Sequence, residues 1–216
     1  RCGVKTAETI WQAKKKCPQL VLVRPHMEKY RYYCGLINEI YQRFTDMVEP
    51  FSIDESWLDV TASQKLFGSG RQIADTIRRT VREELGMTLS AGVSFNKTFA
   101  KMGSEYKKPD ATTEITRENF RELLWPLPAG ELFGVGKATS EKLRQAGIFT
   151  IGDIAASKKP LLISLFGKQG AVMWEHANGI DDDPVALYDQ KEPIKSVGNG
   201  VPFRRNLVSE SDIATA

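Results

Sequence analysis

Apolar side chains recur at three- and four-residue steps in three stretches of the chain, the spacing that places them on one face of a helix. This pattern predicts a short helix over residues 7–16, a long one over residues 27–46 and a third over residues 71–85. Gly86 follows the third stretch, where glycine commonly ends a helix. The side chains expected to face inward are Ile10, Trp11 and Ala13 from the first helix, and Tyr30, Tyr33, Ile37, Ile40, Tyr41 and Phe44 from the second.

Shorter runs of apolar and β-branched residues predict strands. Residues 20–23 are continuously apolar and predict a buried strand. Residues 88–95 alternate large apolar side chains with Ser90, Gly92 and Ser94. This small face suits either a ligand or a closely packed helix, and the pattern favours neither.

Asn96 is a good N-cap for a further helix, which is expected to run to about residue 106. Pro109 disfavours helical backbone in the residue before it, so Lys108 stands at a fixed helix exit. A lysine in that position either stabilises the negative end of the helix dipole or meets a phosphate as a point charge.

Asp54 and Glu55 stand side by side within residues 51–61, a stretch otherwise rich in strand-forming residues. A carboxylate in such a stretch costs desolvation free energy unless something neutralises it. A divalent metal such as Mg²⁺ is one interpretation, because hard cations take carboxylate oxygens and then bind substrate phosphates. The other is a tight hairpin turn with solvated acids.

Strand character ends near residues 125–128, a Trp-Pro-Leu-Pro run that predicts a domain boundary. Beyond it, short helices flank a tight turn that contains Gly134 and Gly136. Free backbone N–H groups at such a turn suit a phosphate without reading base sequence. Residues 181–183, three aspartates before a proline, are interpreted as a solvated loop, and a new strand is expected within residues 195–203.

The order of elements before the boundary, with hairpins that helices can cover, predicts an α+β fold. The 216 residues, 41% hydrophobic and 26% charged, are typical of a soluble globular protein with one large or two ordinary domains. Three cysteines without metal-site spacing predict free thiols and a cytoplasmic location. The net charge is only +3, but residues 1–31 are strongly basic, which suits a polyanionic partner or a solvated helix face.

Several of these motifs together resemble the Y-family (translesion) DNA polymerases, in the DNA polymerase IV branch. Ser52-Ile53-Asp54-Glu55 with Leu58-Asp59-Val60-Thr61 resembles the family's second catalytic motif. The resemblance extends over nearly all of the chain in order and spacing. It includes residues 3–18 (end of the fingers), residues 91–109 (second palm stretch), residues 133–151 (thumb helix-hairpin-helix) and residues 195–198 (start of the little finger).

The resemblance implies an antiparallel palm sheet covered by helices, followed by a small all-helical thumb. The implied domains are a remnant of the fingers (1–25), the palm (26–125), the thumb (126–190), and a linker with the first strand of an incomplete little finger (191–216). The implied catalytic and Mg²⁺-binding residues are Asp54 and Glu55, the triphosphate-binding residue is Lys108, and the DNA-phosphate contacts are Gly134, Val135, Gly136 and Lys137. Asp59 is expected to brace the hairpin.

The implied function is template-directed DNA synthesis past lesions by two-metal nucleotidyl transfer. The implied partners are primer-template DNA, deoxynucleoside triphosphates and, through a tail, a sliding clamp. The family's first metal-ligating aspartate and most of its little finger are not in these 216 residues, so the chain by itself is expected to be inactive. Two alternatives are a non-catalytic helix-hairpin-helix DNA-binding relative and another palm enzyme, such as a nucleotide cyclase.

Overall fold

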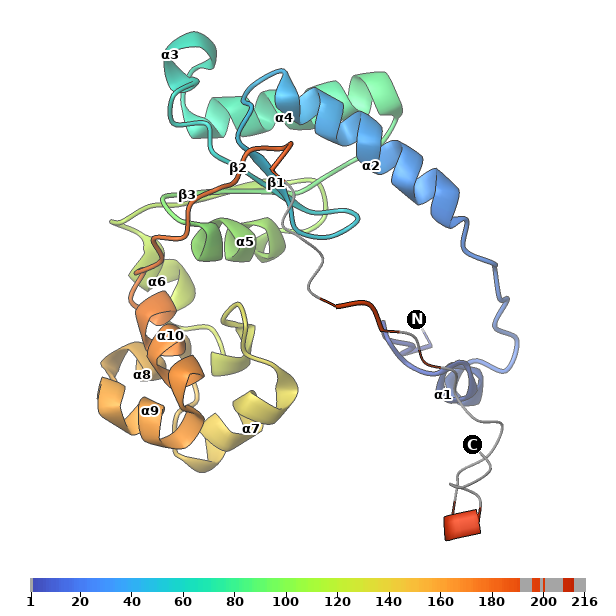
Figure 1. The fold of residues 1–216 in the computed structure, drawn as a ribbon, viewed down its shortest axis with the longest axis vertical. Coiled ribbons are helices and arrows are strands. Elements are labelled where there is room, and N and C mark those ends of the chain that lie inside the picture. Colours follow the sequence, from blue (N-terminus) through green and yellow to red (C-terminus); the bar gives the residue numbers. More distant parts are fainter. Residues whose placement is uncertain (1, 191–195, 199, 201–207, 212–216) are drawn as a thin grey trace.

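The computed structural model describes residues 2–190, 196–198, 200 and 208–211, and Figure 1 shows their course. Two short sheets lie in the first part of the chain and a group of short helices follows. The helices are α1 (Ile10–Lys16), α2 (Met27–Gln42), α3 (Gln64–Phe67), α4 (Gly70–Leu85), α5 (Lys97–Tyr106), α6 (Phe120–Leu124), the 3₁₀ turn η1 (Ala129–Glu131), α7 (Lys137–Gln145), α8 (Ile151–Ala156), α9 (Lys159–Phe166) and α10 (Lys168–Ala177). The strands are β1 (Val48–Pro50), β2 (Ser56–Leu58), β3 (Ala91–Ser94) and β4 (Thr112–Ile115).

The four strands and the helices α2, α4 and α5 form what we call the sheet region. α4, with α2 beside it, covers one face of the strands and α5 covers the other (Figure 1). β1 and β2 pair antiparallel, with Val48 opposite Leu58. β3 and β4 pair parallel, with Ala91 opposite Thr112, because α5 crosses from the end of one strand to the start of the other. The predicted α+β class is confirmed, and the antiparallel pairing holds for the β1–β2 hairpin.

Gly92 explains how closely α5 approaches the second sheet. A Cβ built on this glycine would lie 1.8 Å from the carbonyl oxygen of Ala100 and 2.5 Å from the amide nitrogen of Ser104. No side chain fits in that space, so the absence of a Cβ is what allows the helix to lie against the strand. The small face predicted for residues 88–95 therefore packs under a helix, and its interpretation as a ligand face is wrong at Gly92.

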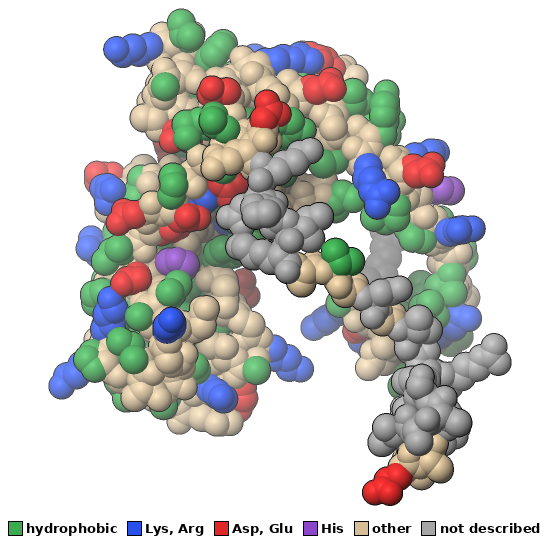
Figure 2. Space-filling view, in the orientation of Figure 1, with side chains coloured by type: hydrophobic (Ala, Val, Ile, Leu, Met, Phe, Trp, Pro, Cys, Tyr) green, Lys and Arg blue, Asp and Glu red, His purple; other side chains and the backbone are tan. Residues whose placement is uncertain are grey.

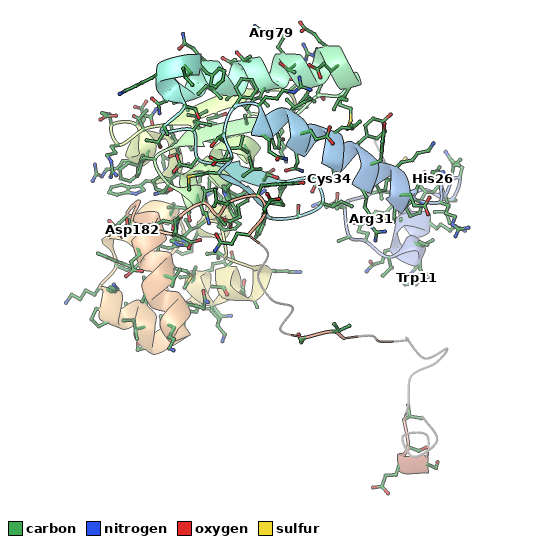
Figure 3. The ribbon with its side chains drawn as sticks, turned by 45° about the horizontal axis from the view of Figure 1, so that its top comes forward. Trp11, His26, Arg31, Cys34, Arg79 and Asp182 are labelled. Carbon is green, nitrogen blue, oxygen red and sulfur yellow. The ribbon has the colours of Figure 1, made fainter. Side chains whose placement is uncertain are left out.

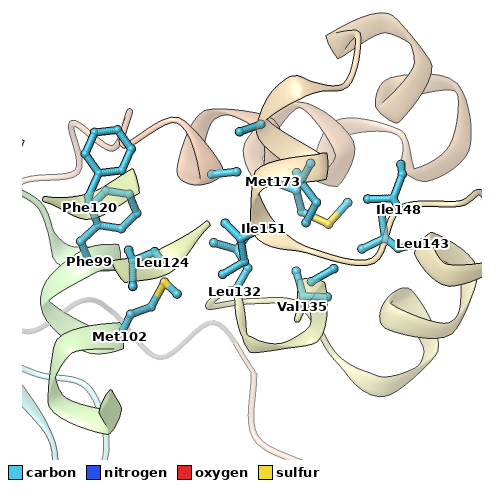
Figure 4. Close-up of a cluster of buried hydrophobic side chains, with 14 of the residues drawn as sticks. Phe99, Met102, Phe120, Leu124, Leu132, Val135, Leu143, Ile148, Ile151 and Met173 are labelled. Atoms are coloured by element: carbon cyan, nitrogen blue, oxygen red, sulfur yellow. The ribbon is translucent and has the colours of Figure 1, made fainter. Parts of the chain in front are cut away.

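Two hydrophobic clusters hold the described chain together. The smaller one joins α2 to α4 through Ile40, Ile73, Ile77 and Val81. The larger one runs without interruption from the sheet region into the helices beyond residue 128, which we call the helical module (η1 to α10). Figure 4 shows members from both sides of that boundary, including Phe99, Met102, Phe120, Leu124, Leu132, Val135, Leu143, Ile148, Ile151 and Met173. The two regions consequently share one core.

The first 26 residues differ from the prediction. α1 begins at Ile10 rather than at residue 7, and the side chains of Ile10 and Trp11 are 58% and 65% exposed, so only Ala13 is buried as expected. Residues 20–23 form no strand, and Val21 is 81% exposed. A strand requires a pairing partner, and the described residues place none beside this run. Figures 1 and 3 show α1 beyond the N-terminal end of α2, away from the sheets.

The long helix α2 is shorter than predicted, because it ends at Gln42. Its inward-facing stripe is also shorter. Tyr30 and Tyr33 are 52% and 39% exposed, whereas Ile37 and Ile40 pack against α4. The N-terminal end of α2 extends past the strands and α4, which leaves the tyrosines without a core to enter (Figure 1).

The helical module is built around two glycine turns with left-handed backbone, at Gly134 (φ +87°) and Gly147 (φ +75°). The first helix of the predicted helix-hairpin-helix is only the 3₁₀ turn η1, and its second helix is α7. Figure 2 shows Lys and Arg side chains spread around the rim of this module. Within the described residues no helix is long and apolar enough to cross a membrane. Most of the strand predicted within residues 195–203 lies outside the described residues.

Candidate active site

The two acids Asp54 and Glu55 lie at the tip of the β1–β2 hairpin. The amide of Phe51 donates to the carbonyl oxygen of Glu55 at 2.9 Å, which closes the turn. The Ser52 hydroxyl lies between the two carboxylates, 2.9 Å from Asp54 Oδ1 and 3.4 Å from Glu55 Oε2. Asp54 is exposed and Glu55 is half-buried. The acids therefore form an open oxygen-rich tip that water and ions can reach.

A chain of ion pairs connects this tip to Lys108. Glu55 Oε1 accepts a short hydrogen bond from Lys101 Nζ, which also lies 3.0 Å from Glu105 Oε1. Lys108 Nζ donates to the same Glu105 oxygen at 2.7 Å. Lys101, Glu105 and Lys108 follow one another at four- and three-residue steps, so α5 and its exit present them along one side. The predicted acid pair and the predicted triphosphate lysine are thus brought to one part of the molecule.

The pKa values of two middle members follow from these contacts. Burial lowers the pKa of Lys101, but its hydrogen bonds to Glu55 and Glu105 outweigh burial, and the pKa is raised. Burial raises the pKa of Glu105, but its hydrogen bonds from Lys108 and Lys101 outweigh that effect, and the pKa is lowered. Both groups are therefore held in their charged forms at neutral pH.

A buried lysine, Lys97 at the start of α5, fixes the base of the hairpin. Its ammonium lies 2.7 Å from Glu49 Oε2 and 2.9 Å from Asp183 Oδ2, and its side chain is only 7% exposed. The backbone carbonyl of Lys97 accepts from the indole N–H of Trp57 at 3.1 Å. Neither Lys97 nor Lys101 was predicted as a site residue, although both stand in residues 91–109, one of the stretches that carry the resemblance. The signal in the sequence was that the two lysines lie four residues apart in a short predicted helix and therefore share one face.

The three aspartates after α10 were predicted to form a solvated loop, but two of them bind residues of α5. Asp181 Oδ2 accepts from the Thr98 amide at 2.9 Å and from the Thr98 hydroxyl at 2.8 Å, so it caps the first turn of α5. Asp183 pairs with Lys97 although its own side chain is 71% exposed, and Asp182, labelled in Figure 3, is exposed as well. Asp181 and Asp183 together tie the segment that leaves the helical module to the helix under the hairpin.

Asp59 lies at the base of the hairpin, as predicted for a bracing residue. Its carboxylate Oδ1 accepts from the Thr61 amide at 2.9 Å, and its carbonyl oxygen accepts from the Thr45 hydroxyl at 2.7 Å. Its own amide donates to the carbonyl of Met47 at 3.1 Å. These bonds close the strand ends behind the acid pair.

The predicted phosphate-binding turn occupies residues 134–137 of the helical module. The Val135 side chain is buried and its amide donates to the Leu132 carbonyl at 2.9 Å. Gly136 is the N-cap of α7 and no side chain caps this helix. Among the described residues, neither the Gly136 nor the Lys137 amide is a donor to another protein group. The turn therefore leaves backbone donors open at the positive end of a helix.

The described residues offer a partial fit to Mg²⁺. Two carboxylates and a hydroxyl are hard oxygen donors, and Mg²⁺ in proteins is commonly bound by one or two carboxylates together with water and substrate phosphates. Within the described part of the chain, no group of three or more His, Cys, Asp or Glu side chains could by itself hold a metal ion. The donor set thus fits a metal that substrate oxygens help to coordinate.

Two family models match the chain. Residues 1–105 match the impB/mucB/samB family, and residues 130–181 match the thumb domain of DNA polymerase iota. The "DNA polymerase IV" of Acetivibrio thermocellus is 47% identical over 210 residues, which is 97% of this chain and 53% of that protein. The "DNA polymerase IV" of Pseudomonas aeruginosa is 42% identical over 192 residues, 89% of this chain and 55% of that protein. The chain spans about half the length of the curated relatives it matches.

Solved structures agree with these matches. The crystal structure of DinB from Sulfolobus solfataricus has a TM-score of 0.76 at 27% identity, covering 85% of this chain and 55% of that one. The insertion ternary complex of Dbh DNA polymerase has a TM-score of 0.76 at 27% identity, covering 85% of this chain and 54% of that one. The fold matches that of a Y-family polymerase palm joined to a helix-hairpin-helix thumb. The chain belongs to the DinB-type Y-family DNA polymerases.

Proposed function

We propose that this chain is the palm and thumb of a DNA polymerase that copies template DNA past lesions. The observation that supports it most directly is the chain of ion pairs from Glu55 through Lys101 and Glu105 to Lys108. It places an open pair of carboxylates and a lysine that can exchange its ion-pair partner in the same part of the molecule. Nucleotidyl transfer needs both, because the leaving diphosphate carries negative charge while the attacking oxygen must be oriented.

In this proposal Asp54 and Glu55, with the Ser52 hydroxyl between them, would hold Mg²⁺ together with the oxygens of the triphosphate. When bound, Mg²⁺ neutralises charge on the phosphate oxygens and orients the reacting groups. Lys108 binds the triphosphate as a point charge, exchanging the carboxylate of Glu105 for a phosphate oxygen. Lys101 holds Glu55 turned toward α5, since it is bonded to both Glu55 and Glu105.

The helical module contributes the grip on primer-template DNA. The open amides of Gly136 and Lys137 suit a backbone phosphate, and contacts to phosphate carry no base information. Phe133, next to this turn, contacts the aromatic rings of the hairpin at 5.9 and 6.2 Å between centroids. The DNA-binding turn and the acid pair therefore belong to one connected surface, as synthesis on a bound primer requires.

Two further proposals concern a partner and the location of the protein. A sliding clamp as a partner rests on the family resemblance. A cytoplasmic location rests on the three cysteines, which are all free thiols among the described residues.

The decisive experiment replaces Asp54 with Ala in the full-length protein and measures primer extension and primer-template affinity together. We expect synthesis to fall by at least about a hundredfold while DNA affinity is retained, because the acid stabilises charge in the transition state. Asp182→Ala is the control, since Asp182 is an exposed acid outside the hairpin. Unchanged synthesis would place the chemistry elsewhere. If the protein binds DNA but neither the parent nor the variant extends a primer, the non-catalytic alternative holds.

A further inference from the structure

Arg78, on α4, has the most hydrogen-bonding partners of the side chains in the sheet region. Its Nε donates to the Leu89 carbonyl at 3.3 Å, and its Nη1 lies 3.2 Å from Asp75 Oδ1 and 3.1 Å from Thr112 Oγ1. Its Nη2 donates to Asp110 Oδ1 at 2.8 Å and makes a short hydrogen bond to the Asp110 carbonyl oxygen. The planar guanidinium is thus fixed from several directions, a role that a single ammonium cannot fill.

The principal target of this network is Asp110, two residues after Lys108. Asp110 has left-handed backbone, φ +53°, which is uncommon for residues other than glycine, although Asp adopts it more often than most. Its carboxylate binds Arg78 through one oxygen and Arg82 through the other. Both arginines come from α4, on the face of the sheet opposite α5. The short connection between α5 and β4 is therefore fixed by two arginines of α4.

Lys108 lies on that fixed connection but has a loosely held head group. Its side chain is 51% exposed, and its ammonium pairs with Glu105, which is 49% exposed. Exposed ion pairs of this kind contribute little to stability and exchange readily with solvent or another anion. The contrast is between a backbone held rigidly through Asp110 and an ammonium that is free to change partner.

We propose that Arg78 is a positioning residue for Lys108: by fixing Asp110 it sets where the lysine leaves the backbone, and so where its ammonium meets the triphosphate. The inference deepens the proposed function and rests on it. Arg78 itself touches no substrate in this arrangement, since its guanidinium is committed to α4, β4 and the connection. Asp75 supports it from the other side, because Thr112 Oγ1 also donates to Asp75 Oδ1 at 2.6 Å.

A double-mutant cycle in the full-length protein tests this. The variants are Arg78→Lys, Lys108→Ala, both together, and Arg79→Lys as the matched control. Arg79 is the next residue on α4, exposed and labelled on its outer surface in Figure 3. The readouts are KM for the incoming nucleotide, kcat, primer-template affinity and the thermal unfolding midpoint. We expect Arg78→Lys to raise the nucleotide KM about tenfold, with DNA affinity retained, and to add nothing once Lys108 is absent. Arg79→Lys should match the parent.

Equal effects of Arg78→Lys with and without Lys108 would overturn the inference, because a general loss of stability acts in both backgrounds. If Arg78→Lys does not fold, Asp110→Asn takes its place in the cycle, since it keeps the size of the side chain and removes its charge. A nucleotide KM unaffected by Asp110→Asn would equally overturn the inference. If Lys108→Ala leaves the nucleotide KM unchanged, the assignment of Lys108 to the triphosphate is wrong and the inference falls with it. If Lys108→Ala raises the nucleotide KM strongly and Arg78→Lys does not, the inference about Arg78 fails while the proposed function stands.

Discussion

The ring of Phe133, beside the turn of the helical module, lies 5.9 Å from the ring of Phe51, at the tip of the hairpin that carries the acid pair. Trp57 completes the cluster, with its ring 4.7 Å from Phe51 and 6.2 Å from Phe133. Aromatic pairs in this range contribute beyond the area they bury. Two segments about eighty residues apart in sequence are therefore held together by three rings, and the same contact joins the predicted phosphate-binding turn to the hairpin that carries the acids.

Phe133→Ala tests this contact. Removing a half-buried ring that joins two regions is expected to lower the free energy of unfolding by roughly 1–3 kcal/mol, less than for a fully buried phenylalanine. Denaturant unfolding measures it. The control is Phe149→Ala, because Phe149 belongs to the same module but is 60% exposed. Comparable losses from the two substitutions would mean that the aromatic cluster contributes nothing specific.

Gly136 offers a test of the phosphate contact that spares the fold. A Cβ at Gly136 would have no neighbour within 4 Å and the backbone φ is −80°, so Gly136→Leu is compatible with folding. It would nevertheless obstruct the open amides at the start of α7. We expect primer-template affinity to fall by a similar factor for all sequences, because phosphate contacts do not read bases. Gln145→Leu, at the other end of α7, is the control. A loss that depends on DNA sequence would contradict phosphate binding.

The sequence was sufficient for the parts of the site that depend on local chemistry. The hairpin tip, the helix that ends at Gly86 and the N-cap Asn96 each follow from side chains acting within a few residues of themselves. What it could not supply were contacts between distant segments. Lys97 meets Asp183 across 86 residues, and nothing in the pattern of either neighbourhood indicates that pairing.

The prediction of a buried strand over residues 20–23 failed for the same reason. Val21 and Val23 have the composition of a buried strand, yet both are about four-fifths exposed, because burial depends on a neighbour and not on the run itself. Gly92 shows the converse case. Its small side chain left two alternatives open, and only the position of Ala100 in three dimensions decided between them.

Asp153 in the helical module predicts a pH-dependent contribution to stability. It forms a capping box with Thr150 at the start of α8, and hydrogen bonds from the Thr150 and Phe149 amides hold the pKa of its carboxyl below its usual value. A lowered pKa in the folded state means that the stabilisation is present above the unfolded pKa of about 3.9 and is lost as the pH falls through the folded value.

We therefore expect Asp153→Asn to cost about 1 kcal/mol of unfolding free energy at pH 7, and less as the pH is lowered below about 4. Urea unfolding at several pH values measures the difference between variant and parent. Asp182→Asn, an exposed aspartate outside any helix, should show no such trend. A cost that stays constant down to acidic pH would show that the charge of Asp153 is not what stabilises the cap.

The 216-residue chain itself is expected to add no nucleotides to a primer. Its hairpin supplies two adjacent carboxylates, and Glu55 is already bonded to Lys101. A two-metal reaction needs carboxylates that hold two ions, one near the attacking oxygen and one near the leaving oxygen. One adjacent pair of carboxylates supplies only some of these ligands. DNA binding by the helical module should persist, because its open amides are independent of the acids. Primer extension with Mg²⁺, alongside a DNA-binding measurement on the same sample, separates the two properties. Clear Mg²⁺-dependent extension by the purified chain would show that the described residues suffice for catalysis.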